Sequence, residues 1–406
     1  MIRSERMTVA GQQGYLESYR VSEIGLLLVG VLALVYWIAV VWPMLDPANR
    51  DFHDFRLYYL AAKAYWNGGD PYEVALRVGN FRIYYIYPAI TLWVFLPFTW
   101  FSYPVACVVY LLLKCLAGVG LVFLWSRVFL GRPGPWFLLF CLFAFNSAWY
   151  IDLETGNVEL FLQLALWSGL ACFISGRYHA FTALVCLAAL FKITPILFIA
   201  LLFLSPGPKR AIRIILPFIG GLAILFLISL IIDPDWLPHM LQESGRNTKL
   251  VAPLNQSVLN LLNDVSRNYF SAGKFWPLVF FAVFVIVVIE VSVRAFRRTF
   301  GPDDDRNLME RRKLGALFAA LLYILILPRL QDYQFLFAIV PCFFLIQRNT
   351  LAAVPLLFVL FVIPATRPRL PGLTDVYQML FHYKEWVIVM LTWIWFARNM
   401  AVRNRT

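Results

Sequence analysis

Acidic residues gather directly after the first long apolar run of the chain. Asp51, Asp54, Asp70 and Glu73 fall within one polar stretch of a sequence in which only 14% of the residues are charged. Asp51 and Asp54 precede a helical pattern, so one of them can be an N-cap or first-turn carboxylate that the helix dipole favours. The functional interpretation is a general base, because a positioned carboxylate can take the proton of a hydroxyl during a group transfer. Both interpretations remain open.

A lysine stands in the middle of an apolar stretch. Lys192 lies within residues 179–204, and Pro195 must bend any helix there. An ionisable group at membrane depth costs about 2.5–3.5 kcal/mol on insertion, and a lysine at the centre of a span reaches water poorly. A lysine beside a helix break indicates a cationic contact with a phosphate or carboxylate.

Polar residues also interrupt the apolar runs in YIDLETGNVEL. Asp152 and Glu154 are explained as well by a solvated loop as by a site. Asn157 and Glu159 begin the next apolar segment, where they need polar partners.

The stretch LVAPLNQSVLNLLND is typical of a capped, partly inserted short helix. Its polar start consists of Asn255, Gln256 and Ser257. These residues either cap the helix or donate hydrogen bonds to a ligand such as a sugar.

In LPRLQDYQF, Arg329 and Asp332 separate two apolar runs. They either form a structural ion pair with each other, or Arg329 joins Lys192 in an anion site suited to a lipid phosphate.

Membrane-spanning helices must position these residues. Of the 406 residues, 61% are hydrophobic, and the mean hydropathy is +0.72, well above that of a soluble globular protein. Lipid satisfies no backbone hydrogen bonds, so apolar stretches of spanning length cross as helices. We expect an all-α polytopic membrane protein that forms one transmembrane domain over residues 1–406, with about 10–13 transmembrane helices, some of them short or broken.

The apolar segments set the order of these helices. The first run, 24–44, is predicted to be a retained anchor, because no small-residue cleavage site follows it. Further segments lie at about 83–100, 103–126, 136–151, 157–175, 179–204, 211–232, 275–295, 313–328, 333–347, 350–365 and 384–401. Several are too short for a full crossing, so half-helices or hairpins are expected. Prolines near 83–104 favour a hairpin there, and whether DLETGN lies inside or outside depends on it.

Basic residues indicate the orientation. The net charge is +12, but the lysines and arginines collect in short loops at about 205–213 and 296–313 and at the C-terminus. This is the pattern of cytoplasmic loops, and it favours membrane topology over a nucleic-acid partner. The long polar regions at about 45–80 and 233–274 then face outward.

The first outward loop contains a predicted amphipathic helix over 54–66, which the turn NGGDPY ends. Its apolar face, expected in the headgroup layer, comprises Phe55, Tyr58, Tyr59, Ala62, Tyr65 and Trp66. Asp70 and Glu73 are assigned to the turn. No cofactor is expected. The six cysteines show no CxxC spacing, and Asp51 with Asp54 offers at most a weak metal site.

Six motifs follow one another in an order that resembles a known family. They are HDFRLYYLAAKAYWNGGDPYE, YIYPAITLWVFLPF, TGNVELFLQLALW, LAALFKITPILFIALLFL, NQSVLNLL and LPRLQDYQF. Together they span about residues 51–335 and resemble bacterial glycosyltransferase family 87. Its members are multi-spanning C-type glycosyltransferases and include polyprenol-phosphate-mannose-dependent α-1,2-mannosyltransferases.

The resemblance implies a C-type glycosyltransferase fold in the bacterial inner membrane, with the active site on the extracytoplasmic side. It implies transfer of mannose, or another hexose or pentose, from a polyprenyl-phosphate donor to a hydroxyl of a lipid-linked or polysaccharide acceptor. The family's base falls on Asp54, with Asp51 as its competitor, and its lysine before Thr-Pro falls on Lys192. The predicted substrate-binding residues are Tyr58, Glu154, Asn157, Glu159, Asn255, Gln256 and Asp332. The family often has Gly-Gln-x-Asn where this chain has Gly-Asn-Val-Glu at 156–159, so donor or acceptor can differ.

The chemistry fits these residues independently. A polyprenyl phosphate leaves as an anion, which Lys192 and Arg329 can stabilise, and a single base without an enzyme nucleophile implies inversion at the anomeric carbon. A nucleotide-sugar donor is disfavoured, because nothing resembles an α/β nucleotide-binding domain. A transporter or lipid-sugar flippase is the alternative, but it predicts two-fold hydropathy repeats that the sequence lacks. A lipid-binding scaffold would leave Lys192 and the acidic loop unexplained.

Overall fold

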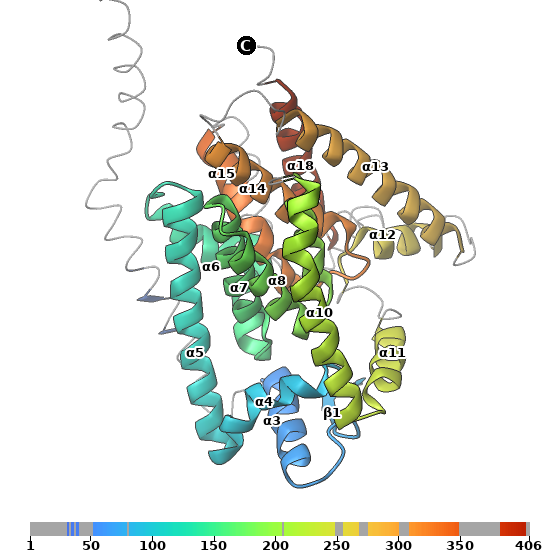
Figure 1. The fold of residues 1–406 in the computed structure, drawn as a ribbon. Coiled ribbons are helices and arrows are strands. Elements are labelled where there is room, and N and C mark those ends of the chain that lie inside the picture. The colour runs from blue at the N-terminus through green and yellow to red at the C-terminus, as the bar shows by residue number, and fades with distance from the viewer. Residues whose placement is uncertain are drawn as a thin grey trace, which may run out of the picture.

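The computed structural model describes most of the chain from residue 52 onward (Figure 1). The described residues are 31, 34, 35, 38, 39, 52–78, 81–204, 207–247, 255–267, 275–299, 308–348 and 382–402. Asp51, the predicted segment 350–365 and nearly all of the predicted anchor at 24–44 lie outside them, so these remain predictions.

Helices dominate the described residues. The α-helices are α3 (His53–Trp66), α4 (Leu92–Phe95), α5 (Tyr103–Leu124), α6 (Trp136–Thr155), α7 (Glu159–Ile174), α8 (Tyr178–Phe191), α9 (Leu201–Leu204), α10 (Pro208–Ile232), α11 (Trp236–Asn247), α12 (Val258–Val265), α13 (Phe275–Thr299), α14 (Leu308–Ile326), α15 (Leu336–Arg348) and α18 (Lys384–Val402). Short 3-10 or π turns are η4 (Ala89–Thr91), η5 (Leu96–Trp100), η6 (Trp125–Phe129), η7 (Thr194–Ala200) and η10 (Asp332–Phe335). The largely helical prediction is confirmed.

One strand pair departs from that prediction. β1 (Ala75–Val78) and β2 (Phe81–Tyr84) form an antiparallel hairpin in which Val78 pairs with Phe81. Two residues, Gly79 and Asn80, separate the strands in the sequence, a composition typical of a hairpin turn. The predicted apolar segment at 83–100 therefore begins inside a strand.

Among the described residues, three helical stretches are long and apolar enough to cross a membrane. They are Tyr103–Phe129, Pro208–Ile232 and Phe275–Arg298. In the last two, only 17% of the most apolar window is buried inside the protein. Side chains such as Ile231 and Ile286 are exposed, as expected for helices that face lipid.

A fourth crossing is possible through α6. Its halves, Trp136–Phe145 and Ser147–Thr155, meet at an angle of 64°. Taken together as one broken span, they are long and apolar enough to cross a membrane. Phe145 and Ser147 both have positive φ angles, 55° and 53°, which are uncommon for residues with a side chain. The bend redirects the second half of α6 and the residues after it.

Several predicted segments are short helices, and this positions the site. The 16 residues of α7 and the 14 of α8 rise about 24 and 21 Å, less than the roughly 30 Å of a bilayer core. The segment at 83–100 continues as the short, broken helical stretch Ala89–Trp100. The short and broken helices expected from the sequence are therefore present, and 83–100 is not one full span.

α3, α4 and β1 lie together next to these short helices (Figure 1). In Figure 1, α3, α4 and β1 lie at one end of the molecule, beside the ends of α5 and α10, whereas the end of α18 lies at the opposite end. α3 contacts α4, η5, α5 and α6. α3 thereby packs against the connection between α6 and α7, where Gly156 lies beside Phe52 and Phe55.

The aromatic face of α3 lies elsewhere than predicted. The Phe55 ring stacks on Tyr110 with centroids 4.1 Å apart, and the Tyr58 ring lies 4.7 Å from Phe95. Both side chains are buried, whereas Trp66 is 68% exposed. The expectation that this face lies among lipid headgroups is wrong for most of it, because α4, η5 and α5 bury it within the protein.

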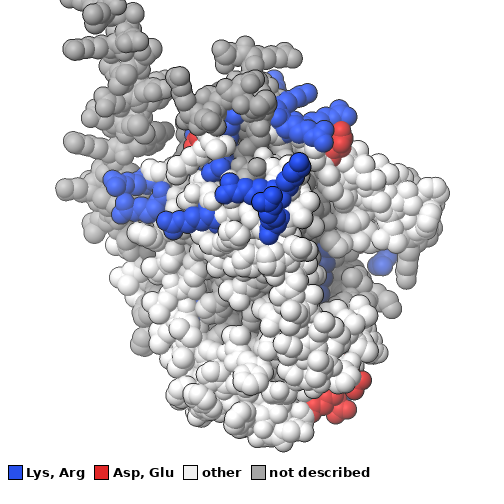
Figure 2. Space-filling view, in the orientation of Figure 1, with Lys and Arg blue, Asp and Glu red and all other residues white. Residues whose placement is uncertain are grey.

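Basic residues gather at the end opposite to α3. Figure 2 shows the visible lysines and arginines mostly in the upper half, and an acidic patch at the lower end. Two pairs near this basic end are exposed: Arg294 with Glu290 at 2.7 Å and Arg348 with Glu310 at 2.9 Å. Most visible basic side chains in Figure 2 thus lie at one end, and the assignment of that end to the cytoplasm stays a prediction.

Candidate active site

Asp54 lies in the first turn of α3 but does not cap the helix. Its side chain is 21% exposed, and its Oδ2 accepts a hydrogen bond from Asn157 Nδ2 at 2.6 Å. The N-cap position is occupied by Phe52, whose side chain forms no cap hydrogen bond. The carboxylate therefore points to the α6–α7 connection. Asp54 is a first-turn carboxylate, as one interpretation predicted, but it is not the N-cap.

The α6–α7 turn (residues 156–158) brings Asn157 to this carboxylate. Gly156 has a φ of 70°, and a Cβ there would lie 2.8 Å from the Phe52 ring and 2.9 Å from Phe55 Cβ. Only glycine combines this backbone with so close an approach of α3. Asn157 Oδ1 accepts from the Glu159 backbone N–H at 3.1 Å, so the same side chain also holds the start of α7.

Lys192 lies at the break between α8 and η7, as Pro195 predicts. Its ammonium lies 2.5 Å from Glu159 Oε2, with exposed side-chain fractions of 18% for Lys192 and 3% for Glu159. Gln163 donates to the other Glu159 oxygen at 2.9 Å. The anion lies at the N-terminus of α7 and the cation at the C-terminus of α8, where each helix dipole favours its charge.

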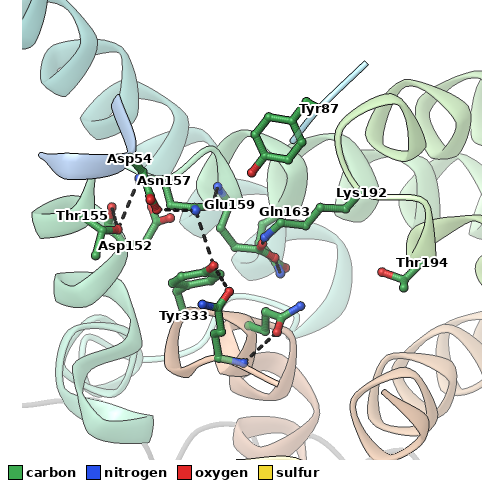
Figure 3. Close-up of polar contacts among 12 residues, drawn as sticks. Asp54, Tyr87, Asp152, Thr155, Asn157, Glu159, Gln163, Lys192, Thr194 and Tyr333 are labelled. Carbon is green, nitrogen blue, oxygen red and sulfur yellow. Dashed lines mark hydrogen bonds and ion pairs between the residues drawn. The ribbon is translucent and has the colours of Figure 1, made fainter. Parts of the chain in front are cut away.

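Tyr333 connects the two halves of this arrangement (Figure 3). Asn157 Nδ2 lies 3.4 Å from the Tyr333 hydroxyl, and Lys192 Nζ lies 4.7 Å from the centre of the same ring. Asp54 and the partly exposed Lys192 thus lie at opposite ends of one polar cluster. A group transfer with an anionic leaving group needs both a base and a positive charge, and this cluster offers them.

Tyrosines line the side of the cluster nearest β1 and β2. Asn157 Nδ2 lies 3.5 Å from the Tyr58 hydroxyl, which lies 3.2 Å from that of Tyr87. Tyr72 donates to the Tyr87 carbonyl at 2.8 Å, and burial raises the pKa of the Tyr72 hydroxyl, so it stays protonated. Tyr58 therefore lies where the sequence places a substrate-binding residue, and that role stays a prediction.

The Asn-Gln-Ser run joins the loop that follows α14. Asn255 Oδ1 accepts from Leu330 N at 2.9 Å, and Gln256 Nε2 donates to Asp332 at 2.5 Å. No ion pair links Arg329 to Asp332 among the described residues, so that structural alternative is wrong. Amides and a carboxylate that were predicted to contact substrate hold two loops together, and direct contact with a ligand stays a prediction.

A comparison with family models decides the class of protein. The model described as glycosyltransferase family 87 matches residues 85–328, more than half of the chain. The chain belongs to glycosyltransferase family 87. No protein with a curated description and no solved structure matches it. Together with its apolar spans, the match makes it a membrane glycosyltransferase, and nothing supports the transporter or flippase alternative.

Most residues of the candidate site lie within the part of the glycosyltransferase that the family model matches. Asn157, Glu159, Lys192 and Gln256 lie inside 85–328, whereas Asp54 lies before it. Glu154 stays apart from the cluster, since its Oε1 accepts from Tyr150 on the same helix at 3.0 Å. Among the described residues, no three His, Cys, Asp or Glu side chains form a group that could hold a metal ion.

Sequence reasoning missed one charged residue of the glycosyltransferase. Lys114 is completely buried in α5 and pairs with Asp152 at 2.7 Å. The signal was available, because Lys114 is the only charged residue within the 22 residues of α5. The argument applied to Lys192, an ionisable group at membrane depth, applies to it equally.

Proposed function

We propose that this glycosyltransferase moves a monosaccharide from a polyprenyl-phosphate donor to a hydroxyl of a lipid-linked or polysaccharide acceptor, with inversion at the anomeric carbon. One observation carries the proposal. Asp54 and Lys192, far apart in the sequence, lie at two ends of one cluster through Asn157, Glu159 and Tyr333.

Lys192 is the proposed contact for the donor phosphate. An ammonium has three N–H donors, and Glu159 takes one of them. The 18% exposed fraction of the Lys192 side chain leaves an approach for an anion. Arg329, half-buried and four residues before Tyr333 in the chain, is the proposed second positive charge. Two cations stabilise the charge that develops on the phosphate as the glycosidic bond breaks.

Asp54 is the proposed base. The acceptor oxygen attacks the anomeric carbon, its proton passes to the Asp54 carboxylate, and the bond between the anomeric carbon and the phosphate oxygen breaks. The electron pair leaves with the polyprenyl phosphate. Asn157 holds Asp54 Oδ2 at 2.6 Å, and Asp54 Oδ1, which lies 3.7 Å from His53 Nε2, is the oxygen proposed to accept the proton. Direct displacement without a covalent enzyme intermediate produces the inversion.

The proposed face is extracytoplasmic. Lysines and arginines gather at the end of the molecule opposite to α3, and basic residues favour the cytoplasmic side. Asp54, carried by α3, then faces the outer leaflet.

The test is transfer by purified protein in lipid nanodiscs from synthetic polyprenyl-phosphate mannose and a panel of other sugars to membrane glycolipid extracts. The expected product is a new glycoside of inverted anomeric configuration, identified by NMR. In oriented vesicles, a membrane-impermeant acceptor should react only from the side of α3. Transfer only from water-soluble nucleotide sugars, or retention of configuration, contradicts the proposal.

Matched variants identify the base. Asp54→Asn should abolish transfer, whereas Glu73→Gln removes an exposed carboxylate of the same loop and should leave it intact. Asp51→Asn tests the competitor, and full turnover in Asp54→Asn combined with loss in Asp51→Asn would move the base to Asp51.

A further inference from the structure

A buried ion pair lies behind the proposed active site. Lys114, midway along α5, and Asp152, near the end of α6, have side chains that are 0% exposed and lie 2.7 Å apart. The Lys114 ammonium also donates to the backbone carbonyls of Asp152 and Asn157, the latter at 2.7 Å. Tyr110, one turn earlier on α5, donates to the same Asn157 carbonyl at 3.3 Å. Two side chains of α5 thus hold one carbonyl of the α6–α7 turn.

Stability alone does not account for this pair. Removing two charges from water is costly, and well-packed apolar residues in place of a buried pair are often as stable. At membrane depth, such charges are retained where they serve function. Neither charge is exposed, so neither reaches a ligand directly.

The contacts of the turn indicate the role. Asn157 is fixed through its carbonyl by α5, and its side-chain amide donates to Asp54 at 2.6 Å. Its Oδ1 holds the Glu159 backbone, and Glu159 pairs with Lys192. The bonds from α5 to the Asn157 carbonyl therefore set the orientation of the Asn157 side chain. That side chain contacts both Asp54 and the start of α7, where Glu159 pairs with Lys192.

We propose that Lys114 and Asp152 are positioning residues for sugar transfer, which act by clamping the α6–α7 turn so that Asn157 aims the Asp54 carboxylate. This inference rests on the proposed role of Asp54 as base. Misplacing a reacting group by about 1 Å costs about 100-fold in rate, so a clamp of this kind affects kcat more than donor binding.

The test compares Lys114→Met/Asp152→Asn with wild type in lipid nanodiscs. Lys114→Met alone leaves a buried, unpaired carboxylate and is expected to fold poorly, whereas the double variant removes both charges. The double variant should show a kcat about 10- to 100-fold lower, with the donor KM within about 3-fold of wild type. Thr392→Val, which removes a buried hydroxyl bonded at 2.8 Å to a carbonyl of its own helix α18, is the matched control and should keep wild-type kcat.

A mutant cycle separates positioning from packing. Asn157→Ala should lower kcat at least 10-fold in wild type but by less than about 2-fold in the double variant, because both changes remove the same orientation of Asp54. Losses that multiply, or an unchanged kcat in a folded double variant, would overturn the inference. If the double variant does not fold, Tyr110→Phe serves instead: it removes one donor to the Asn157 carbonyl and should lower kcat about 3-fold with donor KM unchanged. An unchanged kcat in Tyr110→Phe would overturn it equally.

Hydrogen–deuterium exchange gives a readout that needs no substrate. Peptides covering 152–160 should exchange at least 5-fold faster in the double variant, or in Tyr110→Phe, with α14 unaffected. Absence of transfer by wild type would refute the proposed donor, whereas an unchanged exchange at 152–160 would refute the clamp. The two failures are therefore distinguishable.

Discussion

Lysine–carboxylate and arginine–carboxylate pairs differ sharply between the two ends of the molecule. At the basic end, the side chains of Arg294 and Glu290 are 68% and 55% exposed, and those of Arg348 and Glu310 are 39% and 36% exposed. Around the α6–α7 turn, Lys114 and Asp152 are sealed at 0%. Lys192 with Glu159 lies between these extremes, since only the lysine is partly accessible.

This difference separates pairs on a solvated surface from pairs that the protein buries beside the proposed site. Exposed pairs contribute about 0–1 kcal/mol to stability, and they cost little to form. Buried pairs are expensive to form and destabilise strongly when one partner is lost. The buried charges around the α6–α7 turn are kept in spite of this cost, and among them Lys192, 18% exposed, is the cation proposed to receive an anion.

The largest expected effect is that of Asp54→Asn. Because an asparagine can still accept the hydrogen bond from Asn157 but cannot take a proton, kcat should fall about 1000-fold while the protein folds normally. Steady-state transfer kinetics measure this, with Glu73→Gln as control. A loss smaller than about 10-fold would remove Asp54 from the base role and weaken the contrast between the two ends.

Lys192→Met should have the next largest effect; this variant always carries Glu159→Gln as well, so that no buried carboxylate is left without its partner. It removes the charge proposed to stabilise the leaving phosphate, so kcat/KM for the donor should fall about 100-fold. Lys192→Arg keeps the charge with a different geometry and should retain more activity than Lys192→Met. Equal activity of both variants with wild type would show that this accessible lysine does not receive the donor.

Ser257→Ala tests the loop contacts beside the site. Ser257 Oγ donates to the Pro328 carbonyl at 2.7 Å and accepts from Asn260 N as the N-cap of α12. Losing both bonds should lower the free energy of unfolding by about 1–2 kcal/mol. Unfolding in mixed micelles measures it, and donor KM should stay unchanged. A large rise in donor KM would instead place this loop in the donor site.

The smallest effect is expected for Glu310→Gln at the basic end. It removes an exposed partner of Arg348 and Lys313, so the free energy of unfolding should change by less than about 0.5 kcal/mol and kcat should not change. The same unfolding and transfer assays apply. A change above about 1 kcal/mol would show that the ion pairs at this end stabilise the fold and are not merely solvated surface pairs.

Local signals in the sequence predicted the parts of the structure that depend on neighbouring residues. The break at Lys192 follows from Pro195 and a polar residue within an apolar run, and α3 follows from its pattern and the turn after it. The β1–β2 hairpin had a local signal too, the Gly-Asn dipeptide before the aromatic and β-branched run FRIY, but the hydropathy of 83–100 obscured it.

Long-range pairings were not predictable in this way. Asp54 meets Asn157 across 103 residues, and Gln256 meets Asp332 across 76. Such contacts depend on how many segments cross the membrane between them, which hydropathy did not settle for 83–151. The partner of Lys192 was open for the same reason, since a lysine at membrane depth requires an anion without specifying which one.

Donor binding by two variants tests the central claim most directly. The dissociation constant of an intact polyprenyl-phosphate sugar can be measured on Asp54→Asn and Lys192→Met in identical nanodiscs. The account predicts that Asp54→Asn binds the donor within about 3-fold of wild type without turning it over, whereas Lys192→Met binds at least about 10-fold more weakly. Equal loss of binding in both variants, or wild-type binding by Lys192→Met, would contradict it.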